Sequence, residues 1–248
     1  MLKYYSPLGV ASTKKKDNSP VTQADLEINT LVINEVAKNY PDYRVLAEEE
    51  SNNEVGSKKL FVVDPLDGTL TFTIGSPQFC FSAAVVINGK SIAGVLYNPL
   101  ARRTLLAEEG QGTWLVEENK QVFVSQKDSL DQSLINTGWR DARLAQILHP
   151  LGVKTPAFYA ICEIGSLIAL GGMEAAVFTG LQAHDIAAVK IVVEEAGGKV
   201  TDIFGREQRY DGQIRGAIIS NGPFHNELIK LTEQSGLAAD LEKRANDF

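Results

Sequence analysis

The chain has 248 residues, 44% of them hydrophobic and 22% charged, and its formal net charge is −7. This composition is typical of a folded globular protein with one large or two moderate domains, and it excludes a disordered chain. The negative charge argues against a nucleic-acid partner. No apolar run is long enough to span a bilayer, and residues 1–16 lack the apolar core of a signal peptide, so we expect no membrane partner and a cytoplasmic location.

The first half of the chain predicts one helix followed by a run of short strands. Apolar residues recur at helical spacing from Thr22 to Asn39, after a Ser-Pro pair. Asn88-Gly89 predicts a hairpin turn, and we interpret the strands as an antiparallel meander. The predicted strands are 44–47, 60–63, 79–87, 91–98, 103–108, 113–116 and 121–124.

The second half mixes strands with helices. The predicted helices are 141–148, 166–171, 186–196 and 223–234, and the predicted strands are 175–179, 199–201 and 217–220. The tail, residues 238–248, is polar enough to fray. We therefore expect an α+β fold with an N-terminal half, residues 1–128, and a C-terminal half, residues 129–248. The cysteines Cys80 and Cys162 lie among apolar neighbours, which favours buried free thiols over a disulfide.

Two carboxylates follow the apolar strand 60–63, in the sequence Asp-Pro-Leu-Asp-Gly-Thr at residues 64–69. Ionised carboxylates at the end of a buried strand cost several kcal/mol unless a cation or hydrogen bonds compensate them. Mg²⁺ suits such hard oxygen ligands, and no Cys/His cluster competes. An ordinary turn is the alternative, because Asp-Pro and Asp-Gly both form turns.

Further acids occur at helix starts and after strands. They are Asp25, the pair Glu48-Glu49, and Asp185. Together with Asp64 and Asp67 they could supply a two-metal site, in which ions ~3.5–4 Å apart bind the attacking water and the leaving oxygen. A glycine followed by a helix start also lets backbone N–H groups approach a phosphate. The sequence therefore predicts hydrolysis of a phosphate ester.

With these motifs the chain resembles the inositol monophosphatase family, which comprises Mg²⁺-dependent, lithium-sensitive phosphatases with a layered αβαβα sandwich. The resemblance extends from about residue 15 to residue 221 and includes the segments 75–80, 94–99 and 195–198. It implies a phosphoric monoester hydrolase that acts on a small phosphorylated metabolite, and it is compatible with a homodimer.

The resemblance also implies roles for individual residues. Two or three Mg²⁺ ions are expected, one held by Glu48, Asp64 and the Leu66 carbonyl and another by Asp64, Asp67 and Asp185. The expected catalytic residues are Asp25, Glu48 and Thr69, of which Asp25 and Thr69 would position the attacking water. The expected substrate-binding residues are Asp67, Gly68, Thr69, Gly165 and Ser166.

Several alternatives stay open at this stage. Glu49 could replace Glu48, Asp185 could be only an N-cap, and Ser166 could equally be an N-cap at a helix start. His184 stands where the family usually has Trp, and we interpret it as a packing or hydrogen-bonding residue rather than a ligand. Inositol-specific members often carry a Glu a few residues upstream, where this chain has Phe178-Thr179.

The substrate and the reaction class also have alternatives. Besides inositol phosphate, the candidates are adenosine 3′,5′-bisphosphate, fructose 1,6-bisphosphate and histidinol phosphate. Haloacid dehalogenase phosphatases use a similar loop with an aspartyl nucleophile, but their acids are two positions apart and here they are three apart. A catalytically silent relative that binds a phosphorylated ligand is the remaining alternative.

Overall fold

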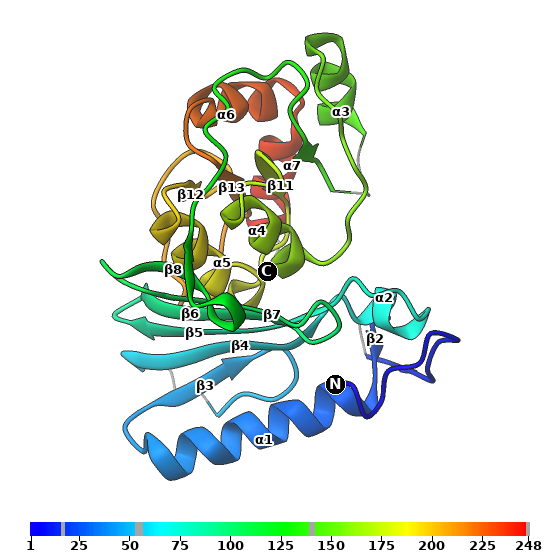
Figure 1. The fold of residues 1–248 in the computed structure, drawn as a ribbon, viewed down its shortest axis with the longest axis vertical. Coiled ribbons are helices and arrows are strands. Elements are labelled where there is room, and N and C mark those ends of the chain that lie inside the picture. The colour runs from blue at the N-terminus through cyan, green and yellow to red at the C-terminus, as the bar shows by residue number, and fades with distance from the viewer. Residues whose placement is uncertain (16–17, 53–56, 139–141, 247–248) are drawn as a thin grey trace.

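The computed structural model describes residues 1–15, 18–52, 57–138 and 142–246. It contains five layers, helix, sheet, helix, sheet and helix, which confirms the predicted α+β sandwich (Figure 1). Helix α1 (Gln23–Asn39) covers one face of a seven-stranded sheet. Helices α4 (Ile161–Ala169) and α5 (Ala183–Glu195) lie between this sheet and a four-stranded sheet. Helices α3 (Arg143–Leu148), α6 (His225–Gln234) and α7 (Leu237–Asn246) pack beyond the smaller sheet.

The larger sheet has the order β3-β4-β5-β6-β7-β8-β9. From β4 onward all neighbours are antiparallel, as predicted, but β3 runs parallel to β4, so the meander prediction is wrong for this first pair. The parallel pairing places the ends of β3 and β4 at the same edge of the sheet. The strands are β3 (Arg44–Ala47), β4 (Lys59–Asp67), β5 (Cys80–Ile87), β6 (Lys90–Asn98), β7 (Arg103–Glu108), β8 (Gly112–Leu115) and β9 (Lys120–Val122).

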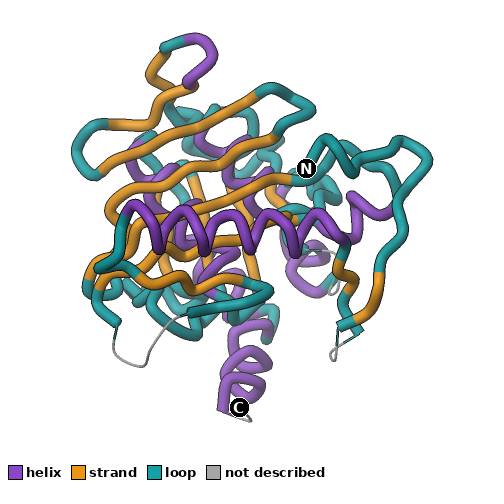
Figure 2. The backbone as a smooth tube through the Cα atoms, turned by 90° about the horizontal axis from the view of Figure 1, so that it is seen from below, coloured by secondary structure: helices purple, strands orange, loops and turns teal. Residues whose placement is uncertain are grey.

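Helix α1 lies across the outer face of this sheet, as Figure 2 shows from below. It begins where the sequence predicts, because Thr22 is the N-cap and accepts a hydrogen bond from the backbone N–H of Ala24. Asp25 accepts from the backbone N–H of Thr22 and completes a capping box. The cap therefore fixes the position of an acid that the sequence assigns to the catalytic site.

The smaller sheet has the order β10-β11-β13-β12. Two short strands, β1 (Thr13–Lys14) and β2 (Pro20–Val21), precede α1, and the short helix α2 (Thr69–Thr73) follows β4. The strands of the smaller sheet are β10 (Ile135–Asn136), β11 (Ala175–Phe178), β12 (Lys199–Thr201) and β13 (Ala217–Ser220). Residue 141, the first of the predicted helix 141–148, lies outside the described residues.

Two helix predictions are wrong in the C-terminal half. Helix α4 begins at Ile161 rather than at Ser166, because Gly165 is not a helix boundary but a packing point inside the helix. The tail predicted to fray forms α7, whose Leu237, Ala238 and Leu241 are buried against the smaller sheet. An amphipathic helix with this few apolar residues reads as polar in the sequence.

Gly165 allows α4 and α5 to approach closely. A Cβ built on Gly165 would lie 2.7 Å from Cγ1 of Val189 on α5. We expect Gly165→Ala to lower the free energy of unfolding by about 1–3 kcal/mol through overpacking, as urea unfolding would measure. Gly212→Ala is the control, because a Cβ there meets nothing within 4 Å. Equal stability of the two variants would contradict this packing role.

The largest apolar cluster fills the space around α4 and α5 and includes residues of both sheets. Cys80 and Cys162 belong to it and are free, buried thiols, as predicted.

The larger sheet ends before residue 128 and the smaller one begins after it, while the division into two halves stays a prediction. Within the described ranges, every helix is too short or too polar to cross a bilayer.

Candidate active site

Acids from distant segments meet at the edge of the larger sheet where β3 and β4 end. Asp64 and Asp67 lie at the end of β4, on either side of an irregularity in its pairing with β5. Such irregularities change the direction of side chains. Asp185 lies in the first turn of α5, and carboxylate oxygens of Asp64, Asp67 and Asp185 all lie within 4.8 Å of one another.

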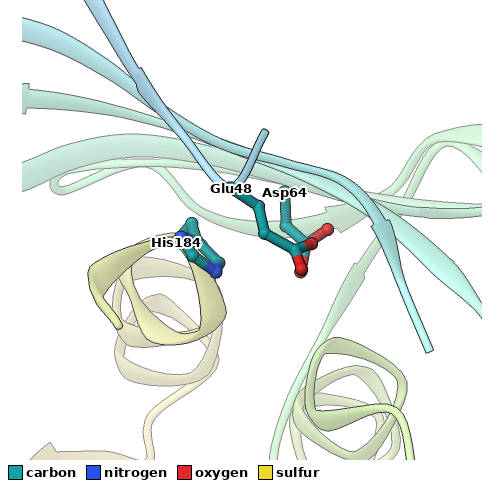
Figure 3. A group of neighbouring side chains, drawn as sticks. All are labelled: Glu48, Asp64 and His184. Atoms are coloured by element: carbon teal, nitrogen blue, oxygen red, sulfur yellow. The ribbon is translucent and has the colours of Figure 1, made fainter. Parts of the chain in front are cut away.

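A second group adjoins the first and shares Asp64 with it. Glu48 follows β3 directly, and its backbone N–H donates to the Val63 carbonyl 3.2 Å away, which extends the parallel pairing. Glu48, Asp64 and His184 offer ligand atoms within 4.8 Å of one another (Figure 3). The fold thus brings together Glu48, Asp64, Asp67 and Asp185, the four acids that the sequence assigns to metal binding.

Glu49 lies in a group with Asp25 and Glu48, and Glu48 is the member of this group that also lies beside Asp64. The Nζ atom of Lys15 is 2.6 Å from Oε1 of both Glu48 and Glu49. The Lys15 contact was not predicted, because only the fold brings residue 15 beside the end of β3.

Asp25 and Thr69 form a buried hydrogen-bonded pair. The Thr69 hydroxyl lies 3.1 Å from Oδ1 of Asp25 and 3.1 Å from the Leu66 carbonyl. The other oxygen of Asp25 accepts from the hydroxyl of Thr22 at 2.6 Å and from its backbone N–H at 2.7 Å. With three donors around it, the Asp25 carboxylate is fixed in one orientation.

Asp67 meets the N-terminus of α4. The backbone N–H of Cys162, in the first turn of that helix, donates to Oδ2 of Asp67 at 2.7 Å. The first N–H groups of a helix have no partner inside the helix, and its dipole favours a negative charge there. The role of Cys162 was not predicted, because the sequence places the helix start too late.

Burial dominates the electrostatics of these acids. It raises the pKa of Asp67 to about 7 and the pKa of Asp64 and Asp185 well above the usual range, and for Asp64 the charges of Glu48, Asp67 and Asp185 raise it further. Burial also raises the pKa of Asp25 and lowers that of His184 to about 4, so His184 is neutral at pH 7. The donor set fits a divalent cation, because four carboxylates bring hard oxygens together while Lys15 contributes a single positive charge beside Glu48.

The raised pKa of Asp67 predicts a pH-dependent effect of Mg²⁺ on stability. Between the ordinary pKa of 3.8 and the folded value of about 7, the folded state keeps a proton that the unfolded state has lost. Without metal, the free energy of unfolding therefore falls as pH rises through this window. Because Mg²⁺ needs the ionised carboxylate, we expect it to raise the melting temperature more at about pH 8 than at about pH 5.5.

Thermal unfolding with MgCl₂, and with NaCl at the same ionic strength as the control, measures this difference. An equal Mg²⁺ effect at both pH values would contradict the assignment of the raised pKa to the metal-binding acids.

A cavity of about 430 Å³ opens beside the acids, a size that suits a small metabolite. Glu48, Asp67 and Asp185 line its acidic end. The remaining wall contains aromatic and polar side chains, and Arg244 of α7 is the only Lys or Arg among its described residues. Its other lining residues include Asn136, Thr137, Phe158, Tyr159, Phe178, Thr179 and Gln182.

The predicted substrate residues differ in where they lie. Gly68 has φ +88° and its Cβ would lie 2.6 Å from the Gln78 carbonyl, so this turn beside Asp67 requires glycine. Neither Gly165 nor Ser166 is among the described residues that line the cavity. Ser166 is buried inside α4 and donates to the Cys162 carbonyl at 3.0 Å, so its interpretation as an N-cap is wrong. Asp185 is not an N-cap either, because that position of α5 is Gln182.

Comparison with known proteins agrees with this arrangement. The sequence model of the inositol monophosphatase family matches residues 1–237. The chain therefore belongs to the inositol monophosphatase family.

Individual relatives cover most of the chain. It is 31% identical over 217 residues to a fructose-1,6-bisphosphatase/inositol-1-monophosphatase of Thermotoga maritima, covering 86% of this chain and 82% of that protein. It is 28% identical over 240 residues to the Nus factor SuhB of Escherichia coli K12, covering 89% and 84%. Among solved structures, an IMPase of Thermotoga maritima has a TM-score of 0.82 at 29% identity and covers 94% of this chain and 90% of its own.

Proposed function

We propose that this protein is a Mg²⁺-dependent phosphomonoester hydrolase that removes phosphate from a small phosphorylated metabolite. The observation that carries the proposal is the shared position of Asp64, which belongs to one ligand group with Glu48 and to another with Asp67 and Asp185. Asp25 lies in a further group with Glu48, and its partner Thr69 contacts the Leu66 carbonyl. Family membership supports the same activity.

In this proposal the acids hold the cations in two adjacent sites. Glu48, Asp64 and the Leu66 carbonyl hold one ion, and Asp64, Asp67 and Asp185 hold another. When bound, Mg²⁺ would lower the pKa of a water and offset the charge of the phosphate. Burial raises the pKa of Asp64 and Asp185, and a bound cation would supply the charge compensation that lets these carboxylates ionise.

Thr69 and Asp25 position the attacking water. When the Thr69 hydroxyl donates to Asp25, its oxygen lone pairs are free to accept a hydrogen bond from water. Asp25 is held by its Thr22 contacts and can take up a proton, since burial raises its pKa. Gly68 permits the backbone turn beside Asp67, because a side chain there would collide with the Gln78 carbonyl. No covalent intermediate is required.

The cavity wall favours a substrate with a second anionic group. Arg244 contributes a positive charge, and its Nη2 donates to the Thr179 carbonyl at 2.8 Å, which holds the guanidinium at the wall. Phe178 lies where inositol-specific members often carry a Glu, and Phe158 adds further apolar surface to the wall. Among the four candidate substrates, these features favour fructose 1,6-bisphosphate and adenosine 3′,5′-bisphosphate over inositol 1-phosphate and histidinol phosphate.

Phosphate release from these four esters tests the proposal. We expect turnover that needs Mg²⁺, stops with a chelator and is inhibited by Li⁺, with a higher kcat/KM for the two bisphosphates. Arg244→Ala should lower kcat/KM for the bisphosphates and leave that for the monophosphates unchanged. Hydrolysis that persists without a divalent cation, or a trapped aspartyl-phosphate, would contradict the mechanism.

The relatives named Nus factor SuhB support a second candidate, a binding role that does not depend on turnover. The Asp67→Asn variant, which should not hydrolyse substrate, distinguishes the two candidate functions. A binding role should be retained in this variant, and an enzymatic role should be lost. The homodimer and the cytoplasmic location stay predictions.

A further inference from the structure

His184 faces the acids from the first turn of α5. It immediately precedes Asp185, and its ring offers a nitrogen within 4.8 Å of carboxylate oxygens of both Glu48 and Asp64 (Figure 3). Two ligands on opposite sides of one ion with bonds of about 2.1 Å are about 4.2 Å apart. A small movement of the three side chains is therefore enough to bring them around one cation.

The other two histidines of the chain differ from His184 in their hydrogen bonds. The ring of His225 lies 2.7 Å from the Ser220 hydroxyl and 3.0 Å from the Thr201 hydroxyl. The ring of His149 lies 2.7 Å from the Thr155 hydroxyl. In the part of the chain that the structure describes, neither ring nitrogen of His184 has such a partner. An imidazole with no such hydrogen bond, beside two carboxylates, has a ring nitrogen available to a metal ion.

We propose that His184 is a nitrogen ligand of the cation held by Glu48 and Asp64, and that it makes this site prefer a first-row transition metal to Mg²⁺. The proposal rests on the metal site of the proposed function. Imidazole suits the first-row transition metals, of which Mn²⁺ is the most oxygen-preferring, whereas Mg²⁺ is bound almost entirely by oxygen. The adjacent site of Asp64, Asp67 and Asp185 has only carboxylate ligands among these residues and keeps the preference for Mg²⁺. The centre would then hold two different cations.

Mn²⁺ is the probe, because it is paramagnetic and needs no substrate. Binding is measured by the loss of the electron paramagnetic resonance signal of free Mn²⁺ in the presence of excess Mg²⁺, and the ligand is identified by pulsed measurement of nitrogen-14 coupling. For the wild-type chain we expect one class of bound Mn²⁺ with imidazole nitrogen coupling.

His184→Phe removes the nitrogen and keeps an aromatic ring. We expect it to abolish the nitrogen coupling and to weaken Mn²⁺ binding by at least about tenfold, with Mg²⁺ affinity unchanged. His149→Phe is the matched control and should retain both signals, because its ring contacts Thr155 away from the acids. His184→Gln provides a second variant should the phenylalanine prevent folding.

Absence of nitrogen coupling in the wild type, or equal Mn²⁺ affinity in the wild type and the folded His184 variant, would overturn the proposal. These measurements do not depend on turnover. A chain that binds Mn²⁺ through His184 but hydrolyses none of the four esters would therefore refute the proposed function alone.

Discussion

Asp67→Asn should lower kcat by more than about 100-fold, because it removes the charge of a proposed metal ligand. Loss of a residue that only hydrogen-bonds to a ligand typically costs about 10- to 100-fold. The fold should survive, since the Asn side-chain oxygen can still accept the hydrogen bond that the Cys162 N–H now donates to Asp67 at 2.7 Å. Steady-state kinetics and urea unfolding measure the two effects separately. The change should also weaken Mg²⁺ binding.

Asp42→Asn is the control for this substitution, because Asp42 is exposed and its ion pair among the described residues is a surface contact with Lys59 at 3.7 Å. It should leave kcat and Mg²⁺ binding as they are. An Asp67→Asn variant with wild-type turnover would rule out Asp67 as a ligand needed for catalysis.

Thr69→Ala should lower kcat by about 10²–10⁴-fold, the range expected for loss of a group that assists proton transfer. Its hydroxyl contacts Asp25 and the Leu66 carbonyl but is not itself a proposed metal ligand, so Mg²⁺ affinity should stay nearly unchanged. Thr69→Ser should recover much of the activity because it keeps the hydroxyl. Steady-state kinetics measure the loss of kcat, and calorimetric titration with Mg²⁺ measures the affinity for the metal.

Thr73→Ala is a control in the same short helix. Its hydroxyl is exposed and donates only to the Leu70 carbonyl at 2.7 Å. Activity should therefore be unaffected. Should Thr69→Ala lose Mg²⁺ binding to the same extent as activity, Thr69 would have to be reassigned from water positioning to support of the metal site.

The acids of the site could be predicted from sequence because each has a local reason to be where it is. Asp64 and Asp67 follow an apolar strand directly, and Asp25 stands three residues after the N-cap Thr22, in the first turn of its helix. An ionised acid at the end of a buried strand is costly without a compensating charge, whereas an acid in the first turn of a helix is favoured there. These local features mark the residues before any contact between them is known.

Other parts of the site depend on contacts between distant segments. The parallel pairing of β3 with β4, which brings Glu48 beside Asp64, has no signal in either strand. The start of α4 at Ile161 was hidden because Gly165 reads as a boundary, while its real role is close contact with Val189. Arg244 was overlooked because α7 is stabilised by packing on the smaller sheet rather than by its own composition.

His184 shows the same limit for a single residue. In the sequence it is a single histidine that precedes an acid. Such a histidine more often packs or forms a hydrogen bond than binds a metal. Only the fold places its ring against Glu48 and Asp64 (Figure 3). Residue type alone therefore could not identify it as a candidate ligand.

The convergence of the acids on metal ions is tested most directly by anomalous diffraction from crystals of the protein grown with Mn²⁺. The account predicts two adjacent peaks that share Asp64 as a ligand at a bond length of about 2.0–2.5 Å, one also near Glu48 and the other near Asp67 and Asp185. Well-ordered crystals with Mn²⁺ bound elsewhere, and no peak within bonding distance of Asp64, would contradict it.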